Sequence, residues 1–266
     1  MTLSIGRDKL TALGVGALVI LLLWRVAPPG SASCNVAYVK LHGTMATYIP
    51  DSQSASSTNE LDQTASDDVT QAIRAAIADP SVRAIVMEVD SPGGSPVAGE
   101  EIQTALKASP KPTVALIRDQ GDSAAYMAAT GADAIFASAF SDVGDIGITQ
   151  SYVDNSRQDE NNGLTFNQLS IGKYKDMFNT DKPMTPDERA LAMKGLQIGY
   201  ERFVQIVSDN RRMSVAAVTK LADGSSVTGE EAVQDGLIDK VGNIDDVRAY
   251  LAQKLGRDAI ICGIDI

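Results

Sequence analysis

The order of apolar and polar residues between Asn35 and Arg118 predicts strands that alternate with helices along the chain. Short segments in which apolar residues alternate or dominate are typical of strands, whereas apolar residues spaced three and four apart are typical of helices. The expected strands are 35–41, 83–89 and 112–118, and the expected helices are 67–79, which ends before Pro80, and 96–108. Strands separated by helices pair in parallel, so the pattern indicates an α/β fold.

The second half of the chain continues this pattern and contains one long helix. Thr185, Pro186 and Glu188 supply an N-cap, a proline at the first helical position and a capping-box glutamate, so the helix begins there and continues to about Arg211. Its expected apolar face consists of Leu196, Tyr200, Phe203 and Val207. The other expected elements are a strand at 134–137, a glycine turn at 141–148, and short helices at 214–222, 228–235 and 243–255.

An uncharged apolar segment, residues 10–24, follows two basic residues near the amino terminus and precedes Arg25. It is shorter than the roughly 20 residues that span a bilayer, but residues 26–27 extend it past an arginine that can snorkel. Basic residues before such a segment favour a cytoplasmic amino terminus. We therefore expect a single-pass anchor in the cell membrane and an extracytoplasmic domain after it. A cleaved signal peptide and a lipoprotein signal before Cys34 are the alternatives.

The charge and the rare residue types exclude several classes of protein. The chain has 34 acidic and 23 basic residues and a net charge of −11, which argues against a nucleic-acid partner. Its single histidine, His42, and its two cysteines are not spaced as metal ligands, so no metal site is expected. In an exported protein, Cys34 and Cys262 are candidates for a disulfide, but the sequence does not decide whether they pair.

A small-residue segment around Ser123 is the first candidate for chemistry. Ser123 follows the strand 112–118 after the short link "DQGD" and precedes an alanine-rich helical segment. A hydroxyl at the amino end of a helix lies where partial positive charge gathers, which suits a nucleophile. Serine is also a favoured N-cap residue, so a purely structural role is the competing interpretation.

A nucleophilic serine also needs amide donors for the oxyanion and a base. The turn "SPGGS" follows a buried strand, and its glycines allow the amides of Gly94 and Ala124 to approach a reacting carbonyl. The base is either His42, which lies early in the chain, or a lysine whose pKa is lowered by burial. Lys173 and Lys175, in "IGKYKDMF", are the lysine candidates. The competing interpretation is that they are a pair of surface lysines at the end of a strand.

Five segments together resemble the signal peptide peptidase A family of Ser-Lys membrane proteases over about residues 35–256. They are "VMEVDSPGGSPVAGEEI", "DQGDSAAYMAATGADAIFAS", "VGDIGI", "IGKYKDMF" and "TGEEAVQDGLIDKVGNIDD". The resemblance implies a Clp protease/crotonase-like α/β fold of repeated strand-strand-helix units, present as a single copy. It also implies Ser123 as nucleophile, Lys175 as base, an oxyanion hole at Gly94 and Ala124, and acyl transfer without a cofactor.

The chain departs from the family pattern at two places. Ser-Gly-Gly is frequent after the turn in relatives, whereas this chain has Ser123-Ala124-Ala125, which keeps the residues small. Where many relatives have Gly-Ser-Ile-Gly, with that serine bonded to the lysine amine, this chain has Asp145 in place of the serine. An ionised Asp145 beside Lys175 favours the ammonium and opposes its action as a base, so Asp145 is expected to modulate the dyad.

The resemblance further implies a homo-oligomeric ring in which neighbouring subunits share the dyad and cut apolar, signal-peptide-like peptides at the membrane. The expected organisation is a cytoplasmic tail and anchor or signal at 1–30, a protease domain at 31–256 and a carboxyl-terminal tail or strand at 257–266. The polar residues from Ser52 to Asp68 predict a mobile loop at about 51–66. The alternative functions are a non-catalytic membrane-anchored scaffold of the same fold, a crotonase-like acyl-CoA enzyme and a phage-capsid-type relative.

Overall fold

A computed structural model describes residues 34–50 and 62–263 of the chain. The predicted membrane segment, the amino-terminal tail and any signal cleavage site lie outside these residues. Within the described ranges, no helix combines the length and the apolar character needed to cross a bilayer. The described residues from Asn35 onward belong to one compact unit.

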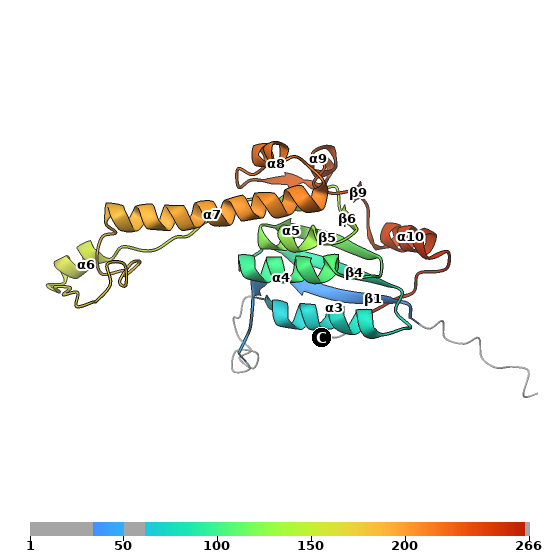
Figure 1. Cartoon of the computed structure of the whole chain (residues 1–266), viewed down its shortest axis with the longest axis horizontal. Coiled ribbons are helices and arrows are strands. Elements are labelled where there is room, and N and C mark those ends of the chain that lie inside the picture. The colour runs from blue at the N-terminus through green and yellow to red at the C-terminus, as the bar shows by residue number, and fades with distance from the viewer. Residues whose placement is uncertain (1–33, 51–61, 264–266) are drawn as a thin grey trace, which may run out of the picture. The chain divides into compact units, whose positions relative to one another are not determined.

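The core of this unit is a mostly parallel sheet with strand order β10-β1-β4-β5-β6-β9 (Figure 1). The sheet strands are β1 (Val36–His42), β4 (Ala84–Ser91), β5 (Thr113–Asp122), β6 (Ala134–Ala137), β7 (Asp142–Gly144), β8 (Ser226–Thr228), β9 (Lys240–Val241) and β10 (Ile261–Gly263). β7 pairs in parallel with the carboxyl-terminal end of β5, and β8 pairs antiparallel with β7. A separate parallel pair consists of β2 (Thr44–Ala46) and β3 (Gln63–Ala65).

Helices cover both faces of the sheet. They are α3 (Ser66–Ala78), α4 (Pro96–Lys107), α5 (Ala124–Ala129), α6 (Ser156–Asn161), α7 (Pro186–Arg211), α8 (Val215–Leu221), α9 (Gly229–Gln234) and α10 (Ile244–Leu255). Apolar residues of α3, α4, α5 and the carboxyl-terminal part of α7 form the larger core with one face of the sheet. Val247 and Leu251 of α10 pack on the other face. The alternation that predicts an α/β fold therefore has its expected physical basis, a sheet buried on both faces.

The helix α7 is buried only at its two ends. Glu188 is buried near the beginning, and the next buried residues are Phe203 and those that follow it. In Figure 1, the first half of α7 extends away from the sheet, and α6 lies near its far end. We call residues 150–185, which lead from the sheet to the beginning of α7, the arm.

Several expected boundaries agree with the structure and two do not. The capping box at Thr185 and Glu188 is present, and α7 ends at Arg211. β5 continues to Asp122, through the segment expected as a link, because its last residues pair with β7. Residues 51–61 of the expected mobile loop lie outside the described residues, and the end of that prediction is wrong, since β3 and the beginning of α3 occupy residues 63–68.

Cys34 and Cys262 lie near the two ends of the described chain, and both are disulfide-bonded. As the chain contains two cysteines, the bond joins these residues. β10 pairs with β1 in the register Ala37 to Cys262, so the strand pairing brings the two chain ends together. The disulfide left open by the sequence therefore links the residue just before β1 to β10, the strand that pairs with β1.

Candidate active site

Ser123 lies between the end of β5 and the beginning of α5, in a backbone conformation that serine rarely adopts. Its φ is 52° and its ψ is −122°. Its amide donates to the carbonyl oxygen of Gly144 at 2.8 Å, and its own carbonyl accepts from the Met127 amide at 3.0 Å. The side chain makes no capping hydrogen bond. Positive φ in a residue other than glycine is costly and is concentrated at functional sites. Ser123 occupies the N-cap position without capping through its hydroxyl, so the structural interpretation loses its main support.

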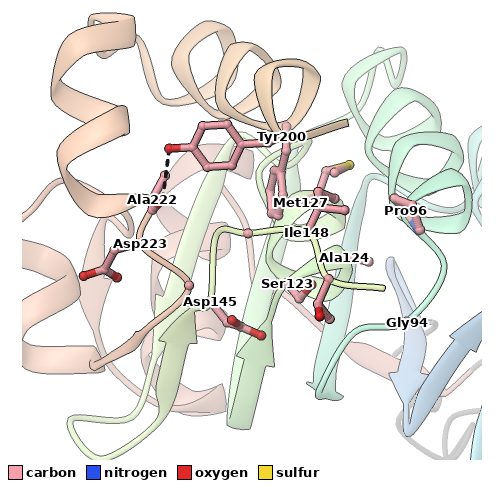
Figure 2. A pocket seen from close by; sticks show the side chains of 14 residues that line it. Gly94, Pro96, Ser123, Ala124, Met127, Asp145, Ile148, Tyr200, Ala222 and Asp223 are labelled. Carbon is pink, nitrogen blue, oxygen red and sulfur yellow. Dashed lines mark hydrogen bonds between the residues drawn. The ribbon is translucent and has the colours of Figure 1, made fainter. Parts of the chain in front are cut away.

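The Ser123 side chain lines a cavity of about 450 Å³ (Figure 2). The cavity has an apolar part and an acidic part. The apolar part is contributed mainly by Pro96, Met127, Ile148, Tyr200 and Phe203, and the acidic part by Asp145 and Asp223. The other lining residues are Gly94, Ala124, Gly147, Thr149, Ala222 and Gly224. The cavity can therefore accept an apolar group beside the serine hydroxyl.

The glycine turn after β4 lies directly against the serine. A Cβ atom on Gly93 would come within 2.9 Å of both the Ser123 Cβ and the Ala124 amide nitrogen. Gly93 also has a φ of 93°, a value that favours glycine. The sequence pattern indicated Gly94 from this pair, and the structure adds Gly93 as the residue whose missing side chain allows the contact.

Gly94 and Ala124, the two expected oxyanion donors, belong to segments that leave their amides available. Gly94 forms a parallel bridge with Met45, in which the Met45 amide donates to the Gly93 carbonyl and the Ser95 amide donates to the Met45 carbonyl. The Gly94 amide therefore points away from Met45. Ala124 is the first residue of α5, where an amide has no acceptor within the helix. Both residues line the cavity that contains Ser123.

Asp145 follows Gly144 and has a φ of 45°. Burial raises the pKa of its half-buried carboxyl group, and no donor from the described part of the chain bonds to that group. Burial also raises the pKa of the neighbouring Asp122, with smaller contributions from the charges of Asp145 and Asp142, although the Ser226 hydroxyl donates to Asp122 at 2.7 Å. Carboxyl groups therefore cluster on this side of the site.

Asp223, the second carboxylate in the cavity wall, differs from Asp145 in being satisfied locally. It accepts hydrogen bonds from the amide and the hydroxyl of Ser225, at 2.9 and 2.6 Å. These bonds lower the pKa of Asp223. Asp223 is thus an exposed, ionised residue that stabilises its own turn.

The structure does not bring Lys175 and Ser123 of one chain together. Lys175 is exposed and lies on the arm, and it is absent from the cavity wall. Two residues earlier, the Lys173 ammonium bonds to Asp187 in the first turn of α7 at 2.7 Å. From there, α7 rises roughly 20 Å before Tyr200 reaches the cavity. A lysine side chain cannot span that distance.

The other candidate bases are engaged elsewhere. Asp187 raises the pKa of Lys173, which makes this lysine a poorer base. His42 does not line the cavity and lies 2.9 Å from the buried carboxylate of Glu88 on the sheet. Within the ranges 34–50 and 62–263, no group of histidine, cysteine or acidic residues is arranged to hold a metal ion.

The carboxyl-terminal part of α7 covers the cavity, which the sequence pattern did not predict. Tyr200 and Phe203 line the cavity, and the Tyr200 hydroxyl donates to the Ala222 carbonyl at 3.0 Å (Figure 2). Their helical spacing identified them as members of an apolar face, but spacing does not say which element that face meets. This hydrogen bond also holds the loop 222–224, whose residues line the cavity, against α7.

The fold and the site define a class of α/β proteins in which a strained serine, a glycine turn and the first amide of a helix surround one cavity. A solved structure of a ClpP1 mutant from Listeria monocytogenes has the same fold, with a TM-score of 0.50 and 14% identity over 78% of this chain and 92% of that one. The family model for peptidase family S49 matches residues 105–257. The chain belongs to this family, which confirms the resemblance to signal peptide peptidase A and the Clp protease-like fold.

Relatives occur in bacteria, archaea and plants. Protease 4 of Salmonella typhi is 34% identical over 192 residues, which are 70% of this chain and 31% of that protein. A protein of Methanocaldococcus jannaschii is 33% identical over 177 residues, 66% of this chain and 57% of that protein. The chloroplastic serine protease SPPA of Arabidopsis thaliana is 31% identical over 175 residues, 65% and 26% of the two chains. The matched part of this chain thus corresponds to less than two thirds of each relative.

Proposed function

We propose that this protein is a membrane-anchored serine endopeptidase whose Ser-Lys dyad is completed between two copies of the chain. One observation carries the proposal. Ser123 is held in a strained conformation in a cavity that no lysine or histidine of its own chain lines, while the exposed Lys175 side chain bonds to no described residue. A second copy supplies what each site lacks.

The exposed surface of the arm supports contact with another copy. Leu169 and Ile171 are 98% and 99% exposed, a few residues before Lys175. Exposed apolar residues beside a functional lysine are typical of a surface that is buried on assembly. Removal of water at such an interface disfavours the charged form of a lysine, which helps it to give up its proton and act as a base.

The reaction in this proposal is acyl transfer. The Lys175 amine of one copy takes the proton of the Ser123 hydroxyl of another, and Ser123 Oγ forms a bond to the substrate carbonyl carbon. The amides of Gly94 and Ala124 donate to the oxyanion. The C–N bond then breaks, and the leaving amine takes the proton from Lys175. Water, deprotonated by the same lysine, attacks the ester carbonyl, the bond between that carbon and Ser123 Oγ breaks, and Lys175 returns the proton to Oγ.

The substrate class follows from the cavity and from the amino-terminal segment. Met127, Ile148 and Phe203 provide an apolar wall beside Ser123, which suits peptides with apolar side chains. The apolar segment 10–24 supports attachment to the cell membrane, with the protease domain on the extracytoplasmic side. Residual signal peptides are apolar and are released at that membrane, so they are the proposed substrates.

Labelling of the purified full-length protein with a fluorophosphonate probe tests this function. We expect covalent labelling at Ser123, and loss of both labelling and peptide cleavage in Ser123→Ala and in Lys175→Ala, with assembly intact in each. Mixed oligomers of the two variants should regain cleavage, because each supplies the group that the other lacks. Cleavage by either variant alone would refute the dyad. Absence of labelling in the wild-type protein would favour the non-catalytic scaffold.

A further inference from the structure

Asp145 carries a charge that its own chain leaves uncompensated. No donor among the described residues bonds to its half-buried carboxylate. None of the residues that line the cavity is a lysine, arginine or histidine. The charged groups near Asp145 are Asp122 on β5, whose pKa the charge of Asp145 raises, and Asp223 after α8, which lines the same cavity, and both are acidic. A half-buried carboxylate among like charges is costly unless a cation approaches it from outside the chain.

The backbone fixes Asp145 relative to the nucleophile. The Ser123 amide donates to the carbonyl of Gly144, the residue directly before Asp145, and the Asp145 amide donates to the Ser225 carbonyl at 3.1 Å. Asp145 keeps a φ of 45°, a conformation that costs energy in a residue other than glycine. Figure 2 shows the side chains of Asp145 and Ser123 at the same end of the cavity. A cation bound by Asp145 would therefore lie beside the serine hydroxyl.

Lys175 is the complementary group. It is exposed on the arm, and its ammonium has no acceptor in the described part of its own chain, whereas the ammonium groups of Lys173 and Lys182 are paired with Asp187 and Glu188. The two pairings fix the arm to the first turn of α7 and leave Lys175 available. In the proposed assembly, the contact that brings Lys175 to Ser123 also brings it to Asp145.

We propose that Asp145 is a positioning residue that binds the Lys175 ammonium of a neighbouring copy in the resting enzyme. This inference rests on the proposed function. The ion pair holds Lys175 Nζ next to Ser123 Oγ, and it also favours the protonated lysine. The lysine must lose its proton before it can act as a base. The acid limb of the activity profile, below which the lysine stays protonated, therefore lies at a higher pH than it would without the carboxylate.

Mixed oligomers of full-length chains test this geometry. In the first mixture, Lys175→Ala chains also carry Asp145→Asn and are combined with Ser123→Ala chains. The working Ser123 then lies beside the introduced asparagine, and the acid limb of kcat should move toward lower pH by about one unit or more. In the second mixture, Asp145→Asn is placed on the Ser123→Ala chains instead. The altered residue then lies in the inactive site, and the acid limb should stay where it is without the substitution.

Asparagine is the matched replacement because it has the shape of aspartate and tolerates positive φ. Asp223→Asn, placed on the chain with the working serine, is the control for a cavity carboxylate that is already satisfied by Ser225, and it should leave the limb in place. An unmoved limb in the first mixture, or equal shifts in both mixtures, overturns the inference while the dyad stands. Failure of the parent mixture to cleave refutes the dyad itself, so the two failures are distinguishable. If the first mixture does not assemble, Asp145→Asn in the otherwise wild-type chain still shows whether the acid limb moves, and an unmoved limb there overturns the inference.

Discussion

The amide of Ser123 donates a hydrogen bond to the carbonyl oxygen of Gly144 at 2.8 Å, and this bond joins the nucleophile to the acidic side of its cavity. It continues the parallel pairing of β5 with β7, in which Asp122 lies opposite Gly144. The last hydrogen bonds between β5 and β7 thus fix the strained turn at Ser123. The same strand pairing places Asp145 directly after Gly144, the residue that accepts the Ser123 bond, so sheet pairing determines the geometry of the site.

Replacing Ser123 by glycine and by alanine should separate the strain from the chemistry. Both variants lose the hydroxyl, so neither should cleave peptides or react with a fluorophosphonate. Glycine adopts the observed φ of 52° without a Cβ penalty, whereas alanine retains that penalty. We expect Ser123→Gly to be more stable than Ser123→Ala by about 1 kcal/mol in urea unfolding. Equal stability of the two variants would mean that the turn stores no strain.

Most of the sheet and its helices could be predicted from the sequence, because their signals are local. Pro80 and the capping box at Thr185 mark helix boundaries through backbone chemistry that acts within a few residues. The strands β7 and β8 could not be predicted, since each has three residues and is stabilised by a partner distant in the sequence. The extension of β5 to Asp122 was missed for the same reason.

The components of the site could be predicted more easily than their arrangement. Ser123, Gly94 and Ala124 are indicated by small-residue turns and Asp145 by its departure from the family pattern, and all four line one cavity. The separation of Lys175 from this cavity depends on the length and direction of α7, which no local pattern reports. The family resemblance also implied a dyad shared between subunits, and that expectation stays a prediction, because a single chain cannot test it.

Gly93→Ala should disrupt the site through backbone contacts. The added Cβ would meet the Asp122 carbonyl oxygen at 2.8 Å and the Ala124 amide nitrogen at 2.9 Å, and the φ of 93° is unfavourable for alanine. We expect a loss of about 2 kcal/mol in stability and, because the turn must shift, a loss of about 100-fold or more in kcat/KM. Urea unfolding and peptide cleavage measure the two effects.

Gly195→Ala is the matched control for this substitution. Gly195 lies within α7, and an added Cβ would meet no atom within 4 Å. Alanine should stabilise the helix by up to about 1 kcal/mol and leave cleavage unchanged. If Gly93→Ala behaved like this control, the close approach of the glycine turn to Ser123 would be irrelevant to the site.

Asp122→Asn should make the protein more stable near neutral pH. Burial raises the pKa of Asp122 in the folded protein above its usual value, so the folded state favours the protonated form. That contribution is present at acidic pH and is lost as the pH rises through the folded-state pKa. Asparagine resembles the protonated carboxyl group and still offers an oxygen to Ser226. Thermal unfolding should show a gain for the variant at pH 7 that vanishes near pH 4, whereas a gain at pH 4 alone would contradict this sign.

Glu88→Gln should destabilise the fold at neutral pH, because Glu88 is a buried carboxylate that joins three strands. It accepts from the Tyr38 hydroxyl, from Arg118 at 2.6 Å and from the His42 ring at 2.9 Å, and its side chain is 7% exposed. Burial alone would raise the pKa of Glu88, but these donors outweigh it and the net shift is downward. The stabilisation is therefore present above the ordinary glutamate pKa and is lost as the pH falls through the folded-state value.

Urea unfolding of Glu88→Gln should show a loss of about 2 kcal/mol at pH 7 that shrinks as the pH falls below about 4. Tyr38→Phe removes one neutral donor and leaves the Arg118 and His42 contacts, so its loss should be about 1 kcal/mol and should depend less on pH. Neither substitution touches the Ser123 cavity, so labelling of Ser123 should persist wherever the variants are folded. A loss in Glu88→Gln that is the same at pH 4 and pH 7 would show that shape, rather than charge, makes Glu88 important.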